Sequence, residues 1–427
     1  MKKVVIVGCG FAGLSAAKIL GQYVDVDVTI IDSRNHHLFQ PLLYQVATGE
    51  LDPSHIAAPI RSILSKYDNI KVLKDTAVDV DLDKKILLTV NGEFKYDYLL
   101  VACGAKHSYF GNDAWEEFAP GLKSIEGALE IKNRIFEAFE VAESTDDLKI
   151  RAKNLSFVVV GGGATGVELA GAIADLSKFI LRKDFSKINT AETKIFLVEG
   201  EKRILSAFSE KTSKKAEQFF KKMGVELVLG KHVTSIDKDG VMIGNTRIEA
   251  ATVLWGAGVK AQNFIKSEKV EIDRAGRVAV EKDLSLKNYP EVFVAGDGSL
   301  AKNRHDKPYP GVATVALQQG RMAGINILRS VTGRKTFKFF YMNRGKAATI
   351  GKGKAVMEIW GYRTAGFKAW MVWLAIHVIF LNGMRNRLFV LLQWVSFYLL
   401  RKGDARIILE RDWRMFAKKE TQNVVSK

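Results

Sequence analysis

Two glycine-rich segments have residue types and spacing suited to binding a nucleotide. Each follows a run of apolar residues that reads as a buried strand, and each precedes a helical pattern. Glycines at this point let backbone N–H groups approach a pyrophosphate, and the N-terminus of the helix supplies a favourable potential for it. The spacing is G-x-G-x-x-G in both segments, with Gly8, Gly10 and Gly13 in the first and Gly161, Gly163 and Gly166 in the second.

An acidic residue closes a second strand after each glycine segment. Asp32 ends the apolar run 28–31, and Glu199 follows the run 194–198. A carboxylate at this place accepts hydrogen bonds from the ribose hydroxyls of a bound dinucleotide. A lone glycine loop can be a plain turn, but two complete strand–glycine–helix–strand–acid units predict two nucleotide sites.

Three further apolar strands end in glycine, at Gly104, at Gly258 and at Gly296, which Asp297 follows. Such an end can return the chain to the phosphates of a cofactor. The carboxylate of Asp297 can bond a ribityl or ribose hydroxyl. An ordinary strand end and a turn aspartate are the alternatives, and the local sequence leaves them open.

The order of these elements predicts an α/β fold with two Rossmann-like dinucleotide-binding domains, the first of which is discontinuous in sequence. A C-terminal amphipathic helical region follows them. We expect the first domain at 1–120, the second at 121–255, the return to the first at 256–330 and the C-terminal region at 331–427.

Helical spacing of apolar and charged residues predicts several helices around these strands. Asp52 followed by Pro53 has the pattern of a helix start, and we expect that helix to continue to Lys66. The other expected helices cover residues 126–143, 209–223 and 312–328.

Composition limits the chemistry that remains. The chain of 427 residues has only 2 cysteines, Cys9 and Cys103, and their positions give neither a disulfide framework nor a redox pair. His36 and His37 are adjacent, but no further ligand has a suitable spacing, so we predict hydrogen bonding and no metal site. Met1 is followed at once by a core strand, without a secretory pattern, which predicts a reducing, cytoplasmic compartment.

The C-terminal region has its own composition. The formal net charge is +17, and 19 Lys and Arg against 5 Asp and Glu place +14 of it in residues 331–427. Two stretches there, 369–384 and 388–400, contain no charged residue. A spanning helix needs about 20 apolar residues, so both stretches are short for crossing a bilayer. Their basic flanks and tryptophans predict helices that lie in the interface of a membrane with anionic lipids.

Two other uses of this region are weighed against membrane binding. A buried helix pair or a contact in a homodimer is the first alternative for the apolar stretches. Nucleic-acid binding is disfavoured, because long aliphatic runs interleave with the basic residues and a phosphate-binding groove does not require them.

Six segments of the sequence resemble the type II NADH:quinone oxidoreductases, which are single-subunit NADH dehydrogenases that do not pump protons. The resemblance extends over nearly the whole chain, including the amphipathic end. Many flavoprotein reductases share the arrangement of two nucleotide domains, but they do not share the second and sixth segments. The segments are VVIVGCGFAGLSAA (4–17), HHLFQPLLYQVATG (36–49), VVVGGGATGVELAG (158–171), VLWGAGV (253–259), VFVAGDGS (292–299) and PGVATVALQQG (310–320).

The resemblance implies FAD in the first unit, NADH in the second and a membrane quinone, ubiquinone or menaquinone, as the acceptor. A hydride passes from NADH to FAD, and two electrons then pass to the quinone. The residues implied to bind FAD are Gly8, Gly10, Phe11, Ala12, Gly13, Asp32, Gly104, Gly296, Asp297, Val312 and Ala313. Those implied to bind NADH are Gly161, Gly163, Gly166, Glu199 and Gly258.

The resemblance also implies that residues 311–319 line the flavin and quinone pocket. The family commonly has two glutamines four residues apart on this helix, and here Thr314 stands at the first place and Gln318 at the second. We expect Gln318 to donate a hydrogen bond to a quinone carbonyl, with a helix-capping amide as the alternative. The shorter side chain of Thr314 puts the quinone affinity in doubt.

Two acidic residues receive specific roles. Glu168 stands in the first turn of the second glycine-loop helix, and we expect it to relay protons, although an acid at a helix start can also simply interact with backbone N–H groups. Glu199 predicts a preference for NADH, because the 2′-phosphate of NADPH would meet its negative charge. Lys202 and Arg203 lie close in sequence and weaken this expectation.

Other functions remain as alternatives. A soluble reductase that passes electrons to a protein acceptor is disfavoured by the apolar C-terminal region. A dithiol reductase needs a close cysteine pair, which the sequence lacks. A non-enzymatic flavin-binding scaffold on a membrane is the third alternative. We expect a monotopic enzyme on the cytoplasmic face of the inner or plasma membrane.

Overall fold

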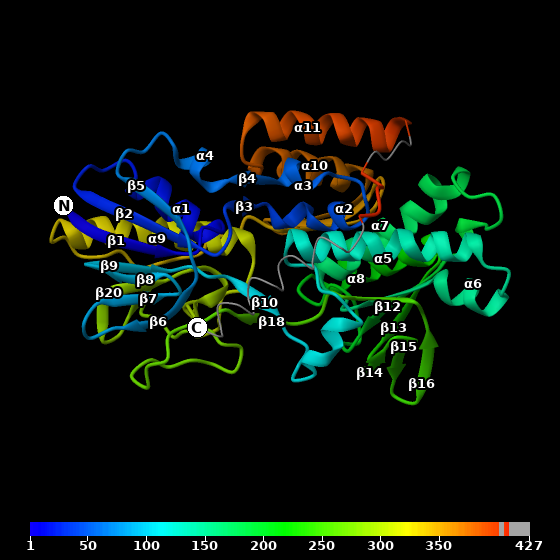
Figure 1. Cartoon of the computed structure of the whole chain (residues 1–427), viewed down its shortest axis with the longest axis horizontal. Coiled ribbons are helices and arrows are strands. Elements are labelled where there is room, and N and C mark those ends of the chain that lie inside the picture. Colours follow the sequence, from blue (N-terminus) through cyan, green and yellow to red (C-terminus); the bar gives the residue numbers. More distant parts are fainter. Residues whose placement is uncertain (401–404, 410–427) are drawn as a thin grey trace.

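The computed structural model describes residues 1–400 and 405–409 (Figure 1). Two sheets form the centres of its two halves, one entirely parallel and one parallel except for the antiparallel edge strand β19. Helices α10 (Phe367–Phe380) and α11 (Met384–Val395) lie over the junction between the halves, and α11 is the outer of the two. The molecule therefore brings two nucleotide-binding sheets and one C-terminal helix pair together.

The first sheet has six strands in the order β19-β20-β9-β1-β2-β5. Strand β1 pairs in parallel with β2 and β9, and β20 pairs in parallel with β9 although it lies far along the chain. Segments from both ends of the nucleotide-binding part thus form one sheet. Its strands are β1 (Lys2–Val7), β2 (Val26–Asp32), β5 (Ile70–Lys74), β9 (Tyr98–Val101), β19 (Ser285–Leu286) and β20 (Tyr289–Val294).

The same distant segments meet again on the face of this sheet. Helix α1 (Phe11–Leu20) packs closely on α9 (Ala313–Val331). A Cβ atom on Gly320 would lie 2.0 Å from the carbonyl oxygen of Ala12, so only glycine permits this approach. The predicted helix at 312–328 is confirmed as α9.

The second sheet has four parallel strands in the order β13-β12-β11-β17. Its central strand β11 is buried throughout and carries the second glycine loop at its end. The predicted helices at 126–143 and 209–223 are confirmed. The elements are β11 (Ser156–Val160), β12 (Lys194–Glu199), β13 (Val225–Leu229), β17 (Thr252–Trp255), α5 (Ile125–Ser144), α6 (Leu148–Asn154), α7 (Ala164–Asp175) and α8 (Glu210–Met223).

Small antiparallel sheets complete the described fold. The sheet β21-β22-β23, which sequence reasoning missed, packs against α7 and α10. The Gly-Lys-Gly turn between two apolar runs at 346–359 is a hairpin signal that could have revealed it. The sheets comprise β6 (Ala77–Asp81), β7 (Ile86–Thr89) and β8 (Gly92–Lys95); β14 (Val233–Asp237), β15 (Gly240–Ile243) and β16 (Thr246–Glu249); β10 (Ala105–His107) and β18 (Val259–Ala261); and β21 (Lys346–Gly351), β22 (Lys354–Ile359) and β23 (Tyr362–Gly366).

The prediction of one continuous helix from Asp52 to Lys66 is wrong, because a strand interrupts it. The structure has α3 (Pro53–Ile56), then strand β4 (Ala57–Pro59), then α4 (Ile60–Leu64). Pro59 disfavours helical geometry at the residue before it. The strand that results pairs with β3 (His36–Leu38), so the contact with a distant segment replaces the local helix.

Short helical turns connect several of these elements. Helix α2 (Leu43–Ala47) lies in the segment that follows β3. The remaining turns are the 3-10 turns Gln40–Leu42, Asp113–Glu117, Leu181–Lys183, Thr190–Glu192 and Gly296–Gly298, and the π turns Leu176–Ile180 and Ser396–Leu400.

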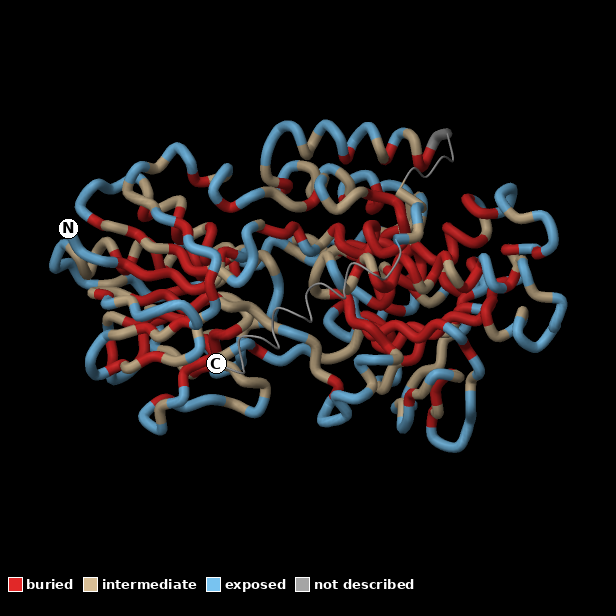
Figure 2. Tube along the Cα trace, viewed as in Figure 1, coloured by how far each residue is buried: buried red, intermediate tan, exposed pale blue. Residues whose placement is uncertain are grey.

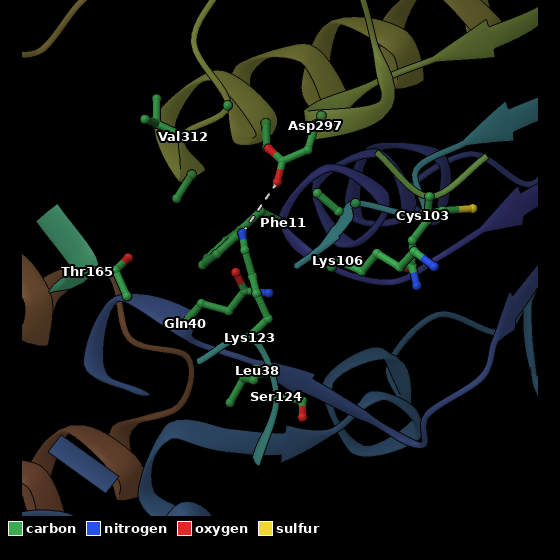
Figure 3. A pocket seen from close by; sticks show the side chains of 18 of the residues that line it. Phe11, Leu38, Gln40, Cys103, Lys106, Lys123, Ser124, Thr165, Asp297 and Val312 are labelled. Atoms are coloured by element: carbon green, nitrogen blue, oxygen red, sulfur yellow. Dashed lines mark ion pairs between the residues drawn. The ribbon is translucent and has the colours of Figure 1, made fainter. Parts of the chain in front are cut away.

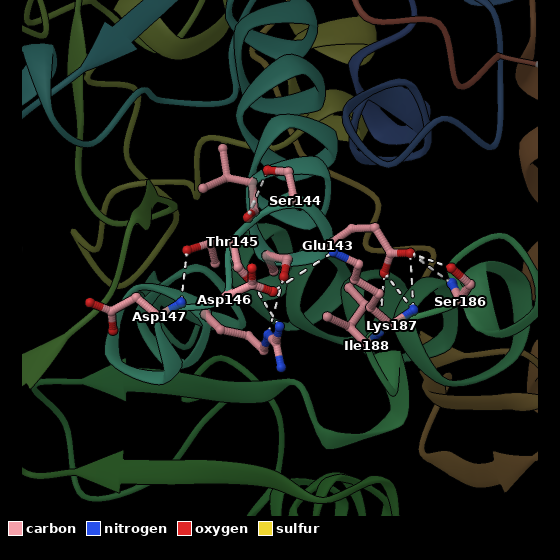
Figure 4. Close-up of polar contacts among 11 residues, drawn as sticks. Glu143, Ser144, Thr145, Asp146, Asp147, Ser186, Lys187 and Ile188 are labelled. Carbon is pink, nitrogen blue, oxygen red and sulfur yellow. Dashed lines mark hydrogen bonds and ion pairs between the residues drawn. The ribbon is translucent and has the colours of Figure 1, made fainter.

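The loop after α7 is tied to the end of α5 by one carboxylate (Figure 4). Glu143 accepts hydrogen bonds from the backbone N–H groups of Ser186 at 2.9 Å, Lys187 at 3.0 Å and Ile188 at 3.1 Å, and from the Ser186 hydroxyl at 2.8 Å. These bonds to the charged form lower the pKa of Glu143 to about 2. The loop is therefore held by an ionised group.

Buried residues follow the two sheets and the helices between them, whereas much of α11 is exposed (Figure 2). Trp373 of α10 is fully buried and Trp394 of α11 is 4% exposed, so both helices contribute to the core. Among the residues that the structure describes, no helix combines the length and apolarity needed to cross a bilayer.

Candidate functional site

A cavity of about 1390 Å³ lies where the two nucleotide units and the C-terminal region meet (Figure 3). Its walls come from the first glycine loop, the first turn of α7, the start of α9 and the segment 341–347. Helix α10 contributes His377. One cavity is therefore lined by residues from both nucleotide units and from the C-terminal region.

The first glycine loop is shaped by close backbone contacts. Gly8 has a positive φ of +91°, and a Cβ there would lie 2.4 Å from the carbonyl oxygen of Ala102. A Cβ on Gly13 would lie 1.8 Å from the carbonyl oxygen of Gly8, so this glycine lets α1 pack on the loop. Asp32 accepts hydrogen bonds from the N–H groups of Cys9 at 2.6 Å and Arg34 at 2.7 Å. These bonds fix its carboxylate beside the loop.

The second glycine loop repeats this construction. Gly161 has a φ of +110°, and a Cβ on Gly166 would lie 1.8 Å from its carbonyl oxygen. Glu199 accepts hydrogen bonds from the N–H of Gly162 and, at 2.8 Å, from the N–H of Glu201. The acid thus has the same relation to its loop as Asp32 has to the first.

The predicted site residues divide into two groups. The first group lines the cavity, and the second group does not. Lining the cavity are Gly8, Gly10, Phe11, Ala12, Asp32, Gly104, Gly163, Glu168, Gly296, Asp297, Val312 and Ala313. Away from its walls are Gly13, Gly161, Gly166, Glu199, Gly258 and Gln318.

The cavity has a backbone surface suited to an extended dinucleotide such as FAD. A Cβ atom on Gly10, Gly104 or Gly163 would meet no atom within 4 Å, so side chains at these positions would project into open space. Gly10 and Gly163 also precede α1 and α7, whose first N–H groups have no side-chain cap. Both helix starts can therefore receive a phosphate group.

Asp297 is held near the start of α9. Its carboxylate lies 3.9 Å from the ammonium group of Lys123 (Figure 3). The preceding Gly296, with a φ of +81°, donates its N–H to Oε1 of Gln319 at 2.7 Å. Lys123 was not singled out from the sequence, because it belongs to no local motif, and Gln319 entered only as the last residue of the range 311–319 that the resemblance implied.

Glu168 is the acidic residue at the wall between α7 and the C-terminal region. Its Oε1 accepts a hydrogen bond from the N–H of Thr349 at 3.4 Å. Burial raises the pKa of Glu168 to about 8, and the bonds to its charged form only partly oppose this effect. The carboxyl group therefore holds a proton at neutral pH, which suits a proton donor.

The polar residues of α9 are engaged with the segment 341–342. The hydroxyl of Thr314 lies 2.9 Å from that of Tyr341, which also lines the cavity. Gln318 donates to the carbonyl oxygen of Met342 at 3.0 Å and accepts from its N–H at 2.9 Å. One N–H of the Gln318 amide is thus bonded to the backbone, and Gln318 is not among the residues that line the cavity, so its donation to a quinone carbonyl stays a prediction.

The histidine pair has structural partners. Nδ1 of His37 lies 3.0 Å from the carbonyl oxygen of Cys9, and Nδ1 of His36 lies 3.1 Å from the side chain of Asn35. Within residues 1–400 and 405–409, no group of three or more metal-ligating side chains is present. Both cysteines are free thiols.

The sequence is similar to proteins of known family. Residues 2–320 match the pyridine nucleotide-disulphide oxidoreductase family. Two proteins of Mycobacterium tuberculosis, both named type II NADH:quinone oxidoreductase, are 40% and 42% identical to the chain. Each alignment covers 95% of the chain, and the two cover 90% and 89% of these relatives.

A solved structure with the same fold is that of NDH2 from Plasmodium falciparum in complex with NADH. It superposes with a TM-score of 0.84 over 96% of the chain and 100% of that protein. Its sequence identity is 19%, so this likeness concerns the fold.

Proposed function

Because the chain belongs to the type II NADH:quinone oxidoreductases, within the pyridine nucleotide-disulphide oxidoreductase family, we propose that NADH, FAD and quinone meet in the shared cavity. The enzyme transfers a hydride from NADH to FAD and then two electrons to quinone. The observation that carries the assignment of the site is that Gly10 of the first unit and Gly163 of the second line the same cavity. Positioning of this kind supplies much of the rate enhancement in a bimolecular transfer.

The first unit binds FAD. The start of α1 receives the pyrophosphate, and the fixed carboxylate of Asp32 accepts the ribose hydroxyls. Asp297, paired with Lys123, bonds the ribityl chain. When bound, FAD supplies the hydride acceptor and the two-electron donor. Gly8, Phe11, Ala12, Gly13, Gly104, Gly296, Val312 and Ala313 complete the surface that holds it.

The second unit binds NADH. Gly161, Gly163 and Gly166 shape the loop for its pyrophosphate, and Glu199 accepts its ribose hydroxyls. Gly258, with a φ of +66°, follows Gly256 and Ala257, whose backbone lies against Gly161. Arg203 is occupied elsewhere, because it donates to the carbonyl oxygen of Phe208 at 2.8 Å and to the Ser213 hydroxyl at 2.6 Å. It is therefore not free to receive a 2′-phosphate.

Glu168 is the proton donor to the quinone. Its carboxyl group is protonated at neutral pH and reaches the cavity. A quinone oxygen that receives electrons becomes basic and takes this proton, solvent supplies the second proton that the two-electron reduction to quinol requires, and solvent also returns a proton to Glu168. The role of Gln318 is to position the segment 341–345, whose Tyr341 and Asn343 line the cavity.

The C-terminal helices bring this site to a lipid surface. Lys368, Arg385 and Arg387 supply positive charge near anionic headgroups. Because His377 of the same helix α10 lines the cavity, a quinone dissolved in lipid has a short route to it. The exposed apolar side chains of the two helices are Phe367, Met371, Val372, Ile379, Phe380, Met384, Leu388, Phe389, Leu391, Leu392 and Val395.

The membrane concerned is the inner or plasma membrane, and the enzyme lies on its cytoplasmic face, where NADH is available. Contact between two copies through the same apolar side chains is the alternative use of this surface. Vesicle binding of a monomer favours the lipid surface, and a dimer that excludes vesicles favours the contact between copies.

One set of assays tests the function. The purified protein should be yellow, and it should oxidise NADH rapidly with a short-chain quinone but slowly with a protein acceptor such as a ferredoxin. A colourless protein that does not take up FAD on reconstitution would overturn the proposal. A protein acceptor that works better than quinone would favour a soluble reductase.

A further inference from the structure

His377 enters the cavity from α10 in a fixed orientation. Its ring is stacked on the indole of Trp373, with the ring centroids 3.8 Å apart. The ring of Phe39 meets it edge-on at 6.2 Å. Nδ1 of His377 lies 2.6 Å from the carbonyl oxygen of Trp373. Three contacts therefore hold the imidazole, and none of them involves Nε2.

The hydrogen bond at Nδ1 fixes where the ring carries its proton. A carbonyl oxygen can only accept, so Nδ1 must be the protonated nitrogen. Burial lowers the pKa of His377 to about 4, so the ring is neutral at pH 7. Nε2 of a neutral ring with this tautomer has a bare lone pair, and it has no hydrogen-bond partner in the described part of the chain.

We propose that Nε2 of His377 accepts a hydrogen bond from a hydroxyl of the quinol, so that this side of the cavity recognises the reduced product and not the quinone. The inference rests on the proposed function, because it requires a quinone in this cavity. The two oxygens of a quinone only accept hydrogen bonds, and a lone pair facing them gains nothing. Each hydroxyl of the quinol can donate, so the same lone pair stabilises it.

This assignment gives different roles to Glu168 and His377, two of the titratable groups in the cavity wall. Glu168 holds a proton at neutral pH and gives it to the quinone oxygen, whereas His377 has none to give. The hydroxyl formed by reduction donates to Nε2. Nε2 binds the oxygen better once it is a hydroxyl than while it is a carbonyl, so it stabilises a transition state in which the quinone oxygen is already partly protonated. Loss of Nε2 should therefore lower kcat for quinone more than it raises KM.

Two variants of His377 and one control test the proposal. His377→Phe keeps a flat ring on Trp373 but removes the lone pair, and His377→Gln retains an acceptor oxygen. His305→Phe changes an exposed histidine outside the cavity and serves as the control. The full-length, FAD-loaded proteins are titrated anaerobically with a short-chain quinol and with the matching quinone, and both dissociation constants are measured.

For His377→Phe we expect the quinol to bind about tenfold more weakly, as the loss of one hydrogen bond predicts, while quinone binding changes less than about twofold. We also expect kcat for quinone to fall with KM nearly unchanged. The Gln variant should lie closer to the wild type in quinol affinity, and the control should equal it.

Equal weakening of quinone and quinol would overturn the inference, since the ring would then only fill space. A larger loss for the quinone would also overturn it, because Nε2 would then be a donor. Bound FAD, measured by absorbance, shows whether each variant is folded. If the wild type does not reduce quinone at all, the proposed function fails, and this outcome is distinct from a His377 variant that behaves like the wild type.

Discussion

The side-chain amide of Gln318 is bonded at both ends to the backbone of one residue, Met342. The pair joins α9 to the segment that carries Tyr341, Asn343 and Gly345 into the cavity. These two bonds hold that segment of the cavity wall against α9.

The first prediction concerns this clamp. Gln318→Ala should loosen the segment, so KM for quinone should rise severalfold while the rate with ferricyanide stays near that of the wild type. Amide hydrogen exchange at Met342 should become faster, because its N–H loses the bond to Oε1. Gln218→Ala, on the exposed face of α8, is the matched control. Unchanged exchange at Met342 together with a raised KM would instead restore Gln318 as a direct quinone ligand.

The second prediction concerns Glu168. Its carboxyl group is protonated below its raised pKa of about 8, so quinone turnover in the wild type should fall as the pH rises through about 8. Glu168→Gln removes the proton, and we expect turnover to drop by about 10²-fold or more and this fall with pH to disappear. Steady-state rates between pH 6 and 9.5 measure both effects. Full turnover with the same pH profile would exclude Glu168 as the donor.

The third prediction concerns nucleotide choice. The carboxylate of Glu199 is fixed by two backbone N–H groups, and Arg203 is bonded within its own turn. NADPH would place a phosphate against this fixed negative charge, so NADH should be strongly preferred. Glu199→Gln removes the carboxylate that repels the 2′-phosphate. The ratio of kcat/KM for NADH to kcat/KM for NADPH should therefore fall by about tenfold or more. Equal oxidation of both nucleotides by the wild type would contradict this account of the site.

The fourth prediction concerns stability and Glu50, which is 5% exposed. Tyr398 donates its hydroxyl to Glu50 at 3.3 Å, and burial raises the pKa of Glu50 from 4.5 to about 8. The folded state therefore keeps a proton that the unfolded state releases above pH 4.5. The resulting stability is complete below pH 4.5 and is lost as the pH rises to about 8.

Glu50→Gln keeps the hydrogen-bonding groups but removes this titration. Relative to the variant, the wild type should lose up to about 1.4 kcal/mol of unfolding free energy per pH unit between pH 5 and 7.5. Urea unfolding at several pH values measures the difference, with the exposed Glu140→Gln as the control. Parallel pH curves for the wild type and Glu50→Gln would show that Glu50 titrates normally.

The fifth prediction concerns the lipid surface. Deleting residues from Gly366 onward would also remove the fully buried Trp373, so substitutions on the exposed face are the cleaner test. Ile379→Glu combined with Leu392→Glu should release the protein from anionic vesicles in a sedimentation assay, because both side chains are exposed. Activity with a water-soluble quinone should persist. Leu148→Glu on α6 is the matched control, and a double variant that still sediments would refute the assignment.

The sequence by itself determined both nucleotide units. A strand, three spaced glycines, a helix and an acid interact with one another locally, so Gly8, Gly161, Asp32 and Glu199 could be identified without knowing the rest of the fold. The family resemblance added the substrates. The helix from Asp52 to Lys66 failed because pairing of β4 with β3 depends on a segment some twenty residues away.

Tertiary structure decided the chemistry of the remaining groups. The raised pKa of Glu168 follows from burial beside Thr349, and the bonds of Gln318 depend on Met342. His377 lines the cavity with Nε2 unbonded only because the fold places α10 against the cavity. Desolvation and hydrogen bonding act between atoms that are close in space, and no local pattern in the sequence specifies those distances.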